Sequence, residues 1–118
     1  MMRLNSIHDV MSMTYDSGAI YADRNVINRG SIVEDSLFYR LGNRNEPGAY
    51  CTPETACIEQ AVYVDDFLSG LTVRRNIIAD TMNGFFSHNG RNHTLQNNVF
   101  LGVSSPMKFA GSFSWGKY

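Results

Sequence analysis

The sequence predicts an all-β fold, and three observations support this prediction. Asn, Ser and Gly, which favour turns, are abundant at 11, 11 and 10 residues. Lys and Leu are scarce at 2 and 7 residues, and no sustained run of strong helix formers occurs. Val, Ile, Phe and Tyr fill short stretches between the turn formers, as is typical of strands.

The length of 118 residues indicates one small domain that spans residues 1–118. With 10 Lys and Arg against 11 Asp and Glu, the net charge is -1, so we expect no nucleic-acid partner. Every apolar run is far shorter than the roughly 18 residues of a membrane span, and we expect no membrane partner. Residues 1–6 lead directly into a polar stretch, so we expect no signal peptide in this chain.

The first internal repeat has a period of 22 residues. Leu71–Ile78 reads LTVRRNII, and His93–Phe100 reads HTLQNNVF at a shift of 22. An earlier copy, Ser31–Phe38, lies 40 residues before the first of these. Such self-similarity at a fixed spacing is the signature of a repeat architecture.

A second repeat is interleaved with the first. Ala61–Asp66 recurs as Gly84–Asn89 at a shift of 23, and again as Pro106–Gly111 at a shift of 22. Ala19–Arg24 is a forerunner of the same pattern. Two strand patterns that repeat together at about 22 residues describe one coil of a solenoid.

These repeats predict a right-handed single-stranded parallel β-helix of about four coils, each of about 22 residues. In such a fold the same strands of successive coils pair at about 4.8 Å, and alternate side chains point into the tube. The expected inward columns are Ile20, Val62, Phe85 and Met107, and Ala22, Val64, Ser87 and Phe109. Asn76 and Asn98 occupy equivalent positions and are expected to form an amide ladder.

Two segments of the chain depart from the repeat. An insertion at about 40–59, with Pro47 and Pro53, is expected to be an external loop, and 112–118 a C-terminal tail.

A β-sandwich is the main alternative fold, but two repeat patterns shifted by the same spacing argue against it. Helical spacing is confined to the short stretches 7–13 and 55–60.

Three stretches of the chain resemble right-handed parallel β-helix repeat proteins that act on carbohydrate. Residues 5–10 and 15–21 are similar to the family pattern Asn-x-Ile-His-Asp-Val followed by Asp-Gly-Gly-Ala-Ile-Tyr. Residues 61–66 resemble Gly-Ile-Tyr-Leu-Asp-Asp, and 84–92 resemble Gly-Ile-Phe-Ile-His-Gly-Gly-Arg-Asp. Ser17, Asn89 and Asn92 depart from these patterns.

The resemblance implies a carbohydrate-active β-helix, such as a glycoside hydrolase or a polysaccharide lyase. The expected partner is a polysaccharide or oligosaccharide, and the expected location of the parent protein is extracellular or periplasmic. Since such relatives have many more coils, we expect either a fragment or a homo-oligomer that covers the open ends of the tube.

Four acids are the candidate catalytic residues, because glycoside hydrolysis uses a pair of carboxyl groups. Aligning the repeats places Asp23, Asp65 and His88 in one column. Asp65 and Asp66 are the first candidates, and Asp16 and Asp23 come next. For hydrolysis, Asp65 would be one member of the acid/base pair and Asp16 or Asp23 the other. Crowded acids also raise the pKa of one of them, as a general acid requires.

The candidate substrate-binding residues are His88, Arg91, Tyr21 and Tyr63. His88 could hold substrate or tune the acid, and Arg91 offers a fork for a sugar carboxylate. Tyr21 and Tyr63 offer rings for stacking on sugars. Each also has a purely structural interpretation, as turn formers or as cover for the outside of the tube.

Hydrolysis is the favoured activity, and two alternatives stay open. A lyase would need Lys108, Arg91 and His88 to neutralise a uronate and act as base. A non-catalytic glycan-binding module would need no reaction at all.

We expect no cofactor and no metal. Cys51 and Cys57 have no nearby Cys or His to complete a metal site, and a disulfide between them or two free thiols are both open.

Overall fold

The chain is all-β with parallel strands. The computed structural model describes residues 1–11, 16–24, 29–42 and 58–111. Every regular element in these ranges is a strand, so the short helical stretches considered as alternatives are not found there. Accordingly, no helix of the described part has the length and apolar character needed to cross a membrane.

The described residues form ten strands, from β1 to β10. Their bounds are Met2–Arg3 (β1), Ser6–His8 (β2), Asp16–Ala22 (β3), Ile32–Glu34 (β4), Leu37–Tyr39 (β5), Ile58–Val64 (β6), Thr72–Arg74 (β7), Ile77–His88 (β8), Thr94–Gln96 (β9) and Val99–Ala110 (β10).

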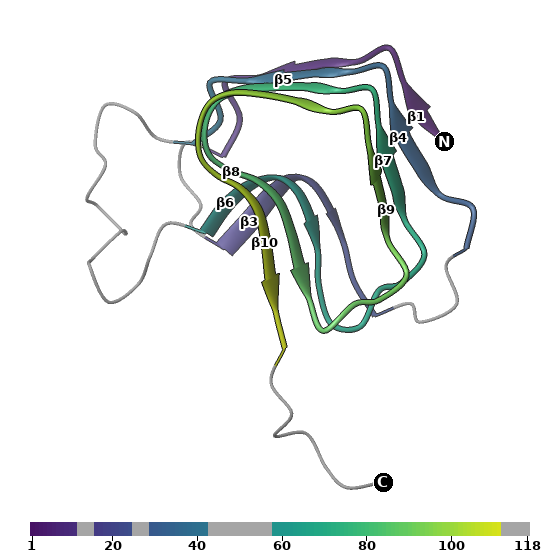
Figure 1. Cartoon of the computed structure of the whole chain (residues 1–118). Coiled ribbons are helices and arrows are strands. Elements are labelled where there is room, and N and C mark those ends of the chain that lie inside the picture. The colour runs from purple at the N-terminus through teal and green to yellow at the C-terminus, as the bar shows by residue number, and fades with distance from the viewer. Residues whose placement is uncertain (12–15, 25–28, 43–57, 112–118) are drawn as a thin grey trace, which may run out of the picture.

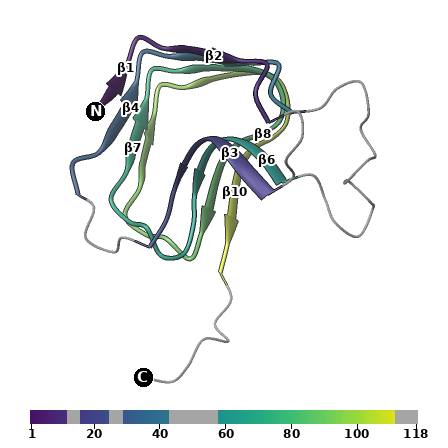
Figure 2. The same cartoon turned by 180° about the vertical axis from the view of Figure 1, so that it is seen from behind.

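These strands build two parallel sheets that curl around a common core (Figure 1). The smaller sheet has the order β1-β4-β7-β9, and the larger has the order β2-β5-β8-β6-β3, with β10 paired to β8. The long strand β8 therefore joins β5 to β6 within one sheet, and β10 follows it along nearly its whole length. Figure 2, from behind, shows the same stacked passes of the chain.

The strand register confirms the spacing of the repeats. Val73 pairs with Leu95 at a separation of 22 residues. Val62 pairs with Phe85, and Phe85 pairs with Met107, at separations of 23 and 22. The equivalences expected from sequence are thus the actual backbone pairings.

Sharp corners connect the strands, and single left-handed residues occupy equivalent positions at these corners. One corner uses φ values of 51–57° at Leu4, Asp35, Arg75 and Asn97. A second uses Asp9, Arg40, Asp80 and Gly102, with φ of 50–60°. Asn, Asp and Gly tolerate this conformation best, which explains several of these residue types and the curled shape of the sheets.

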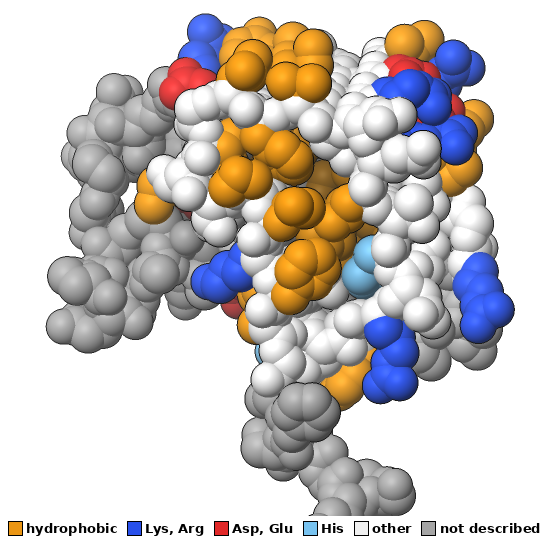
Figure 3. All heavy atoms as spheres, viewed as in Figure 1, with side chains coloured by type: hydrophobic (Ala, Val, Ile, Leu, Met, Phe, Trp, Pro, Cys, Tyr) orange, Lys and Arg blue, Asp and Glu red, His pale blue; other side chains and the backbone are white. Residues whose placement is uncertain are grey.

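The core lies between the sheets, and the columns that the sequence predicted to point inward supply part of it. Val62, Val64 and Phe85 of these columns are fully buried, and so is Phe38, which lies outside them. By contrast, Met107 and Phe109, in the same columns on β10, are 51% and 63% exposed. The difference arises because β10 pairs only with β8 in the described part of the chain, so its other edge has no covering strand there. Figure 3 shows hydrophobic side chains (orange) exposed on this face of the molecule.

The expected amide ladder is present beneath the first corner. Asn76 is fully buried, and its side-chain amide donates to the carbonyl of Val33 and to Oδ1 of Asn98, each at 3.0 Å. Asn98 donates in turn to the carbonyl of Val73 at 2.9 Å. These bonds satisfy buried backbone groups that the turn leaves without a ladder partner.

Most of the predicted insertion at about 40–59, including Cys51 and Cys57, and the tail 112–118 lie outside the described residues. Within the described part, Leu41 is buried and β6 already begins at Ile58.

Candidate functional site

The candidate site lies where three neighbouring strands end. Ala22 of β3 pairs with Val64 of β6, which pairs with Ser87 of β8. The next residues, Asp23, Asp65 and His88, therefore occupy equivalent positions on adjacent strands. This is the column that the repeat alignment predicted.

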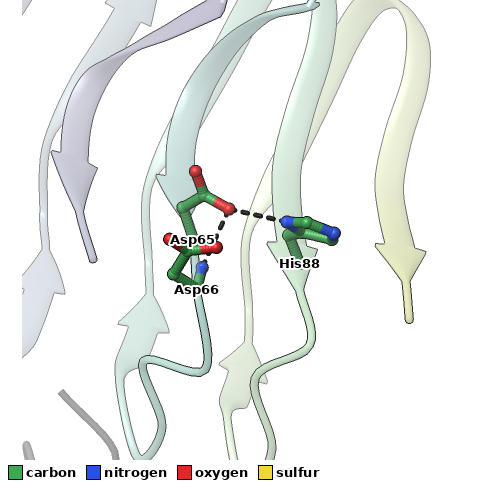
Figure 4. Close-up of side chains that lie close together, drawn as sticks. All are labelled: Asp65, Asp66 and His88. Atoms are coloured by element: carbon green, nitrogen blue, oxygen red, sulfur yellow. Dashed lines mark hydrogen bonds and ion pairs between the residues drawn. The ribbon is translucent and has the colours of Figure 1, made fainter. Parts of the chain in front are cut away.

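Asp65 is at the centre of a hydrogen-bond network (Figure 4). Its Oδ1 accepts from Nδ1 of His88 at 2.7 Å and from the backbone amide of Asp66 at 2.8 Å. Its Oδ2 accepts from the hydroxyl of Tyr21 at 2.8 Å. The side chain of Asp65 is only 14% exposed, so most of its contacts are with protein groups.

These contacts favour the charged form of Asp65. Burial alone would raise the pKa of its carboxyl group. Hydrogen bonds from His88, Tyr21, the amide of Asp66 and Tyr63 outweigh burial and hold the pKa below its ordinary value. Asp65 is therefore an ionised carboxylate at neutral pH, suited to act as a base or a nucleophile.

Asp66 occupies a tight turn next to Asp65. Asp66 and Phe67 both have left-handed backbone, with φ of 40° and 70°. A bulky residue such as Phe67 rarely adopts this conformation, and such strain is often found at functional sites. Oδ2 of Asp66 accepts a hydrogen bond from Nε of Arg24 at 3.1 Å, which raises the pKa of Arg24.

The other two candidate acids lie around this centre. Asp23 is beside Asp65 in register, and its carboxylate is 3.8 Å from Nε of Arg24. Asp16 begins β3 and is exposed. Burial and then the charge of Asp16 raise the pKa of Tyr63, so Asp16 acts on the site through its electric field.

An aromatic row crosses the strands beside the acids. The rings of Tyr21 and Tyr63 meet edge to face with centroids 5.0 Å apart, and Tyr63 lies 4.8 Å from Phe86. The ammonium group of Lys108 is over the ring of Phe86 at 5.2 Å. Only Tyr21 of these rings is substantially exposed, at 48%, so the stacking surface that the sequence predicted is small.

Arg91 lies apart from the acids, in a neighbouring pocket of about 370 Å³. The loops that follow β6 and β8 form most of it, through Phe67, Ser69 and Asn92. Arg29, from the loop that precedes β4, also lines this pocket. Sequence reasoning missed Arg29 because it lies outside both repeats, and no spacing signal marks it.

Asp65, Asp66 and His88 offer three atoms that could hold a metal ion, all within 4.8 Å of one another. In the structure, Asp65 accepts hydrogen bonds from Nδ1 of His88 and from the backbone amide of Asp66, and Nε of Arg24 donates to one oxygen of Asp66. A cation bound here would compete with the bonds from His88 and Arg24. The network is a pair of adjacent acids that accept hydrogen bonds from His88, Tyr21 and Arg24.

Comparison with protein-family models found none that matches the chain, and comparisons with curated proteins and with solved structures found no significant match. The resemblance to carbohydrate-active proteins therefore stays an expectation from sequence.

Proposed function

We propose that the chain is a carbohydrate-active right-handed parallel β-helix that hydrolyses glycosidic bonds with Asp65 and Asp66. The repeated register supports the solenoid, because equivalent residues of successive passes pair directly. We further propose about four coils of about 22 residues, a saccharide partner and a parent protein outside the cytoplasm. A second copy covering the ends of the tube is part of this proposal.

The observation that carries the proposal is the arrangement around Asp65. Its carboxylate is kept ionised, and an oxygen of Asp66 lies within 4.8 Å of it. Retaining glycosidases hold their two carboxyl groups about 5–5.5 Å apart, whereas inverting enzymes need more room for a water molecule. Adjacent acids with oxygens this close are compatible with a retaining reaction, in which Asp65 would be the nucleophile and Asp66 the acid/base.

His88 and Tyr21 serve as positioning residues in this mechanism, since both donate to Asp65. Asp16 and Asp23 contribute negative charge at the edges of the site, which favours the positive charge that develops on the sugar in the transition state.

One observation favours a non-catalytic glycan-binding module as the second candidate. Both oxygens of Asp65 already accept hydrogen bonds from protein groups, as in a purely structural carboxylate. In that case saccharide would bind to the exposed ring of Tyr21 and its neighbours without turnover.

Activity measurements on a panel of polysaccharides separate these functions. For a hydrolase we expect new reducing ends, retention of the anomeric configuration by NMR, and losses of at least about 100-fold in rate for Asp65→Asn and Asp66→Asn. Asp35→Asn, an acid of the other sheet, is the control and should retain activity. Unsaturated products that absorb in the ultraviolet would instead indicate a lyase, and binding without any product would indicate the module.

If wild-type activity is present and both Asp65→Asn and Asp66→Asn keep it, the assigned acids are wrong.

A further inference from the structure

The pocket beside the acids carries two arginines without a carboxylate partner in the described part of the chain. Five other arginines there each form an ion pair with Asp or Glu. They are Arg3, Arg24, Arg40, Arg74 and Arg75. Arg29 and Arg91 form no such pair among the described residues, although both line the pocket.

Among the described residues that line this pocket, none is acidic. Asn92 contributes an amide to it, and Ser69 accepts from the backbone amide of Arg91 at 3.1 Å and so fixes that loop. Guanidinium groups bind carboxylate and sulfate through paired hydrogen bonds. The pocket therefore has the chemistry of an oxyanion site.

Phe67 adds an exposed aromatic side chain to the same pocket. Its ring is 41% exposed. Its backbone is held at a φ of 70°, and its amide donates to the carbonyl of His88 at 3.3 Å. An exposed ring kept in an uncommon conformation offers a flat apolar surface on which a sugar ring can stack.

The position of the pocket connects it to the acids. Phe67 directly follows Asp66, and the loop that carries Arg91 starts directly after His88. The acids themselves would repel an anionic ligand, so an acidic sugar can bind here only if its charge lies on the arginine side.

We infer that the pocket is a subsite for an acidic sugar, whose carboxylate or sulfate ester binds Arg29 and Arg91 while its ring stacks on Phe67. This inference rests on the proposed function, since it names the substrate class of the same site. In this inference the pocket selects for an acidic sugar. Two of its residues, Arg29 and Phe67, were not candidates from the sequence repeats.

Calorimetric titration with three oligosaccharides of one sugar backbone tests this inference. The ligands are a neutral dextran oligomer, its carboxymethyl derivative and its sulfated derivative, with sodium sulfate as a further ligand. At low salt we expect at least one charged oligomer to bind about tenfold or more tightly than the neutral one, and binding to weaken as salt is added. Whichever derivative binds more tightly identifies the oxyanion.

Three variants and a matched control complete the test. Arg29→Gln and Arg91→Gln should each weaken binding of the charged oligomer about fivefold to tenfold, and Phe67→Ala should weaken the charged and neutral oligomers alike. Arg3→Gln removes another exposed arginine, from β1 of the smaller sheet, and should leave binding unchanged. Equal binding of the charged and neutral oligomers, equal losses for Arg3→Gln and Arg91→Gln, or sulfate binding as tightly as the saccharide would overturn the inference.

Asp65→Asn distinguishes this inference from the proposed function. If the wild type and Asp65→Asn bind the charged oligomer equally and neither cleaves any glycan, the hydrolase proposal fails while the subsite stands. If the wild type cleaves a neutral glycan and the arginine variants cleave it at the same rate, the subsite fails while the hydrolase stands.

Discussion

The Nδ1 atom of His88 lies 2.7 Å from Oδ1 of Asp65, although the two residues are 23 positions apart in the sequence. They meet because β6 and β8 pair in parallel, so equivalent residues at the ends of the two strands become neighbours. An ionised carboxylate accepts only, so His88 donates this hydrogen bond. The pairing of β6 with β8 therefore determines that His88 and Asp65 meet in the candidate site.

His88→Gln should raise the pKa of Asp65, because it weakens one of the hydrogen bonds that favour the carboxylate. The folded pKa of Asp65 is below its unfolded value. Its contribution to stability is thus fully present above about pH 4 and is lost as the pH falls through the folded pKa. We expect His88→Gln to reduce stability at neutral pH and to flatten its dependence on pH below about pH 4.

Carboxyl-carbon NMR titration checks this prediction, and His8 provides the control. His8 forms the same kind of contact with Asp9, at 2.7 Å, at the end of β2. Arg40 and then His8 lower the pKa of Asp9 to about 2. His8→Gln should raise the pKa of Asp9 and leave that of Asp65 unchanged, so an equal response of Asp65 to both variants would contradict the assignment.

The pKa of Tyr21 depends on the charge of Asp65, because the Tyr21 hydroxyl donates a hydrogen bond to that carboxylate. Burial, followed by the hydrogen bond to Asp65, raises the pKa of Tyr21 to about 12. Asp65→Asn removes the negative charge, so the phenolate becomes less unfavourable and the pKa of Tyr21 should fall toward the ordinary value of about 10. It should stay above that value because burial remains.

NMR titration of the tyrosine ring carbons measures this change. Asp35→Asn removes a carboxylate from the other sheet and should not move the titration of Tyr21. An unchanged Tyr21 in Asp65→Asn would mean that burial alone sets its pKa.

Asn76→Ala should destabilise the fold by about 3 kcal/mol, because two buried backbone groups lose their partners. The side chain accepts from the amide of Ser36 and donates to the carbonyl of Val33, both at 3.0 Å. Asn98, its neighbour in the ladder, is only partly buried, so water can replace some of its bonds. We therefore expect about 1 kcal/mol for Asn98→Ala.

Urea denaturation of both variants tests the ladder. Equal losses of stability for Asn76→Ala and Asn98→Ala would contradict the expectation that the more buried amide contributes more to stability.

The repeats allowed the register to be predicted because each repeat reuses the same pattern. The column of Asp23, Asp65 and His88 and the inward column through Val62 and Phe85 follow from counting residues. Backbone pairing fixes both columns, and the register of that pairing follows the repeated hydrophobic pattern and the turns between the strands.

The hydrogen bonds within the site could not be predicted in the same way. Whether Asp65 bonds His88 or Asp23 depends on side-chain rotamers and on the turn at Asp66 and Phe67. The pairing of Arg24 with Asp66 depends on those same details. The left-handed corners do carry a sequence signal, since the turn formers Asp9, Asp80 and Gly102 recur at equivalent positions.

Phe85 and Phe109 offer a final test, because adjacent columns of the same core place one ring inside and the other at an uncovered edge. Phe85 is fully buried and Phe109 is 63% exposed, with ring centroids 5.8 Å apart. Phe85→Ala should cost about 3–5 kcal/mol in stability, and Phe109→Ala less than about 1 kcal/mol. Thermal and urea unfolding at several protein concentrations measure both. If Phe109→Ala costs as much as Phe85→Ala, and its cost grows with protein concentration, then β10 is covered in solution by a second copy, since a free edge would leave that ring in water whatever the concentration.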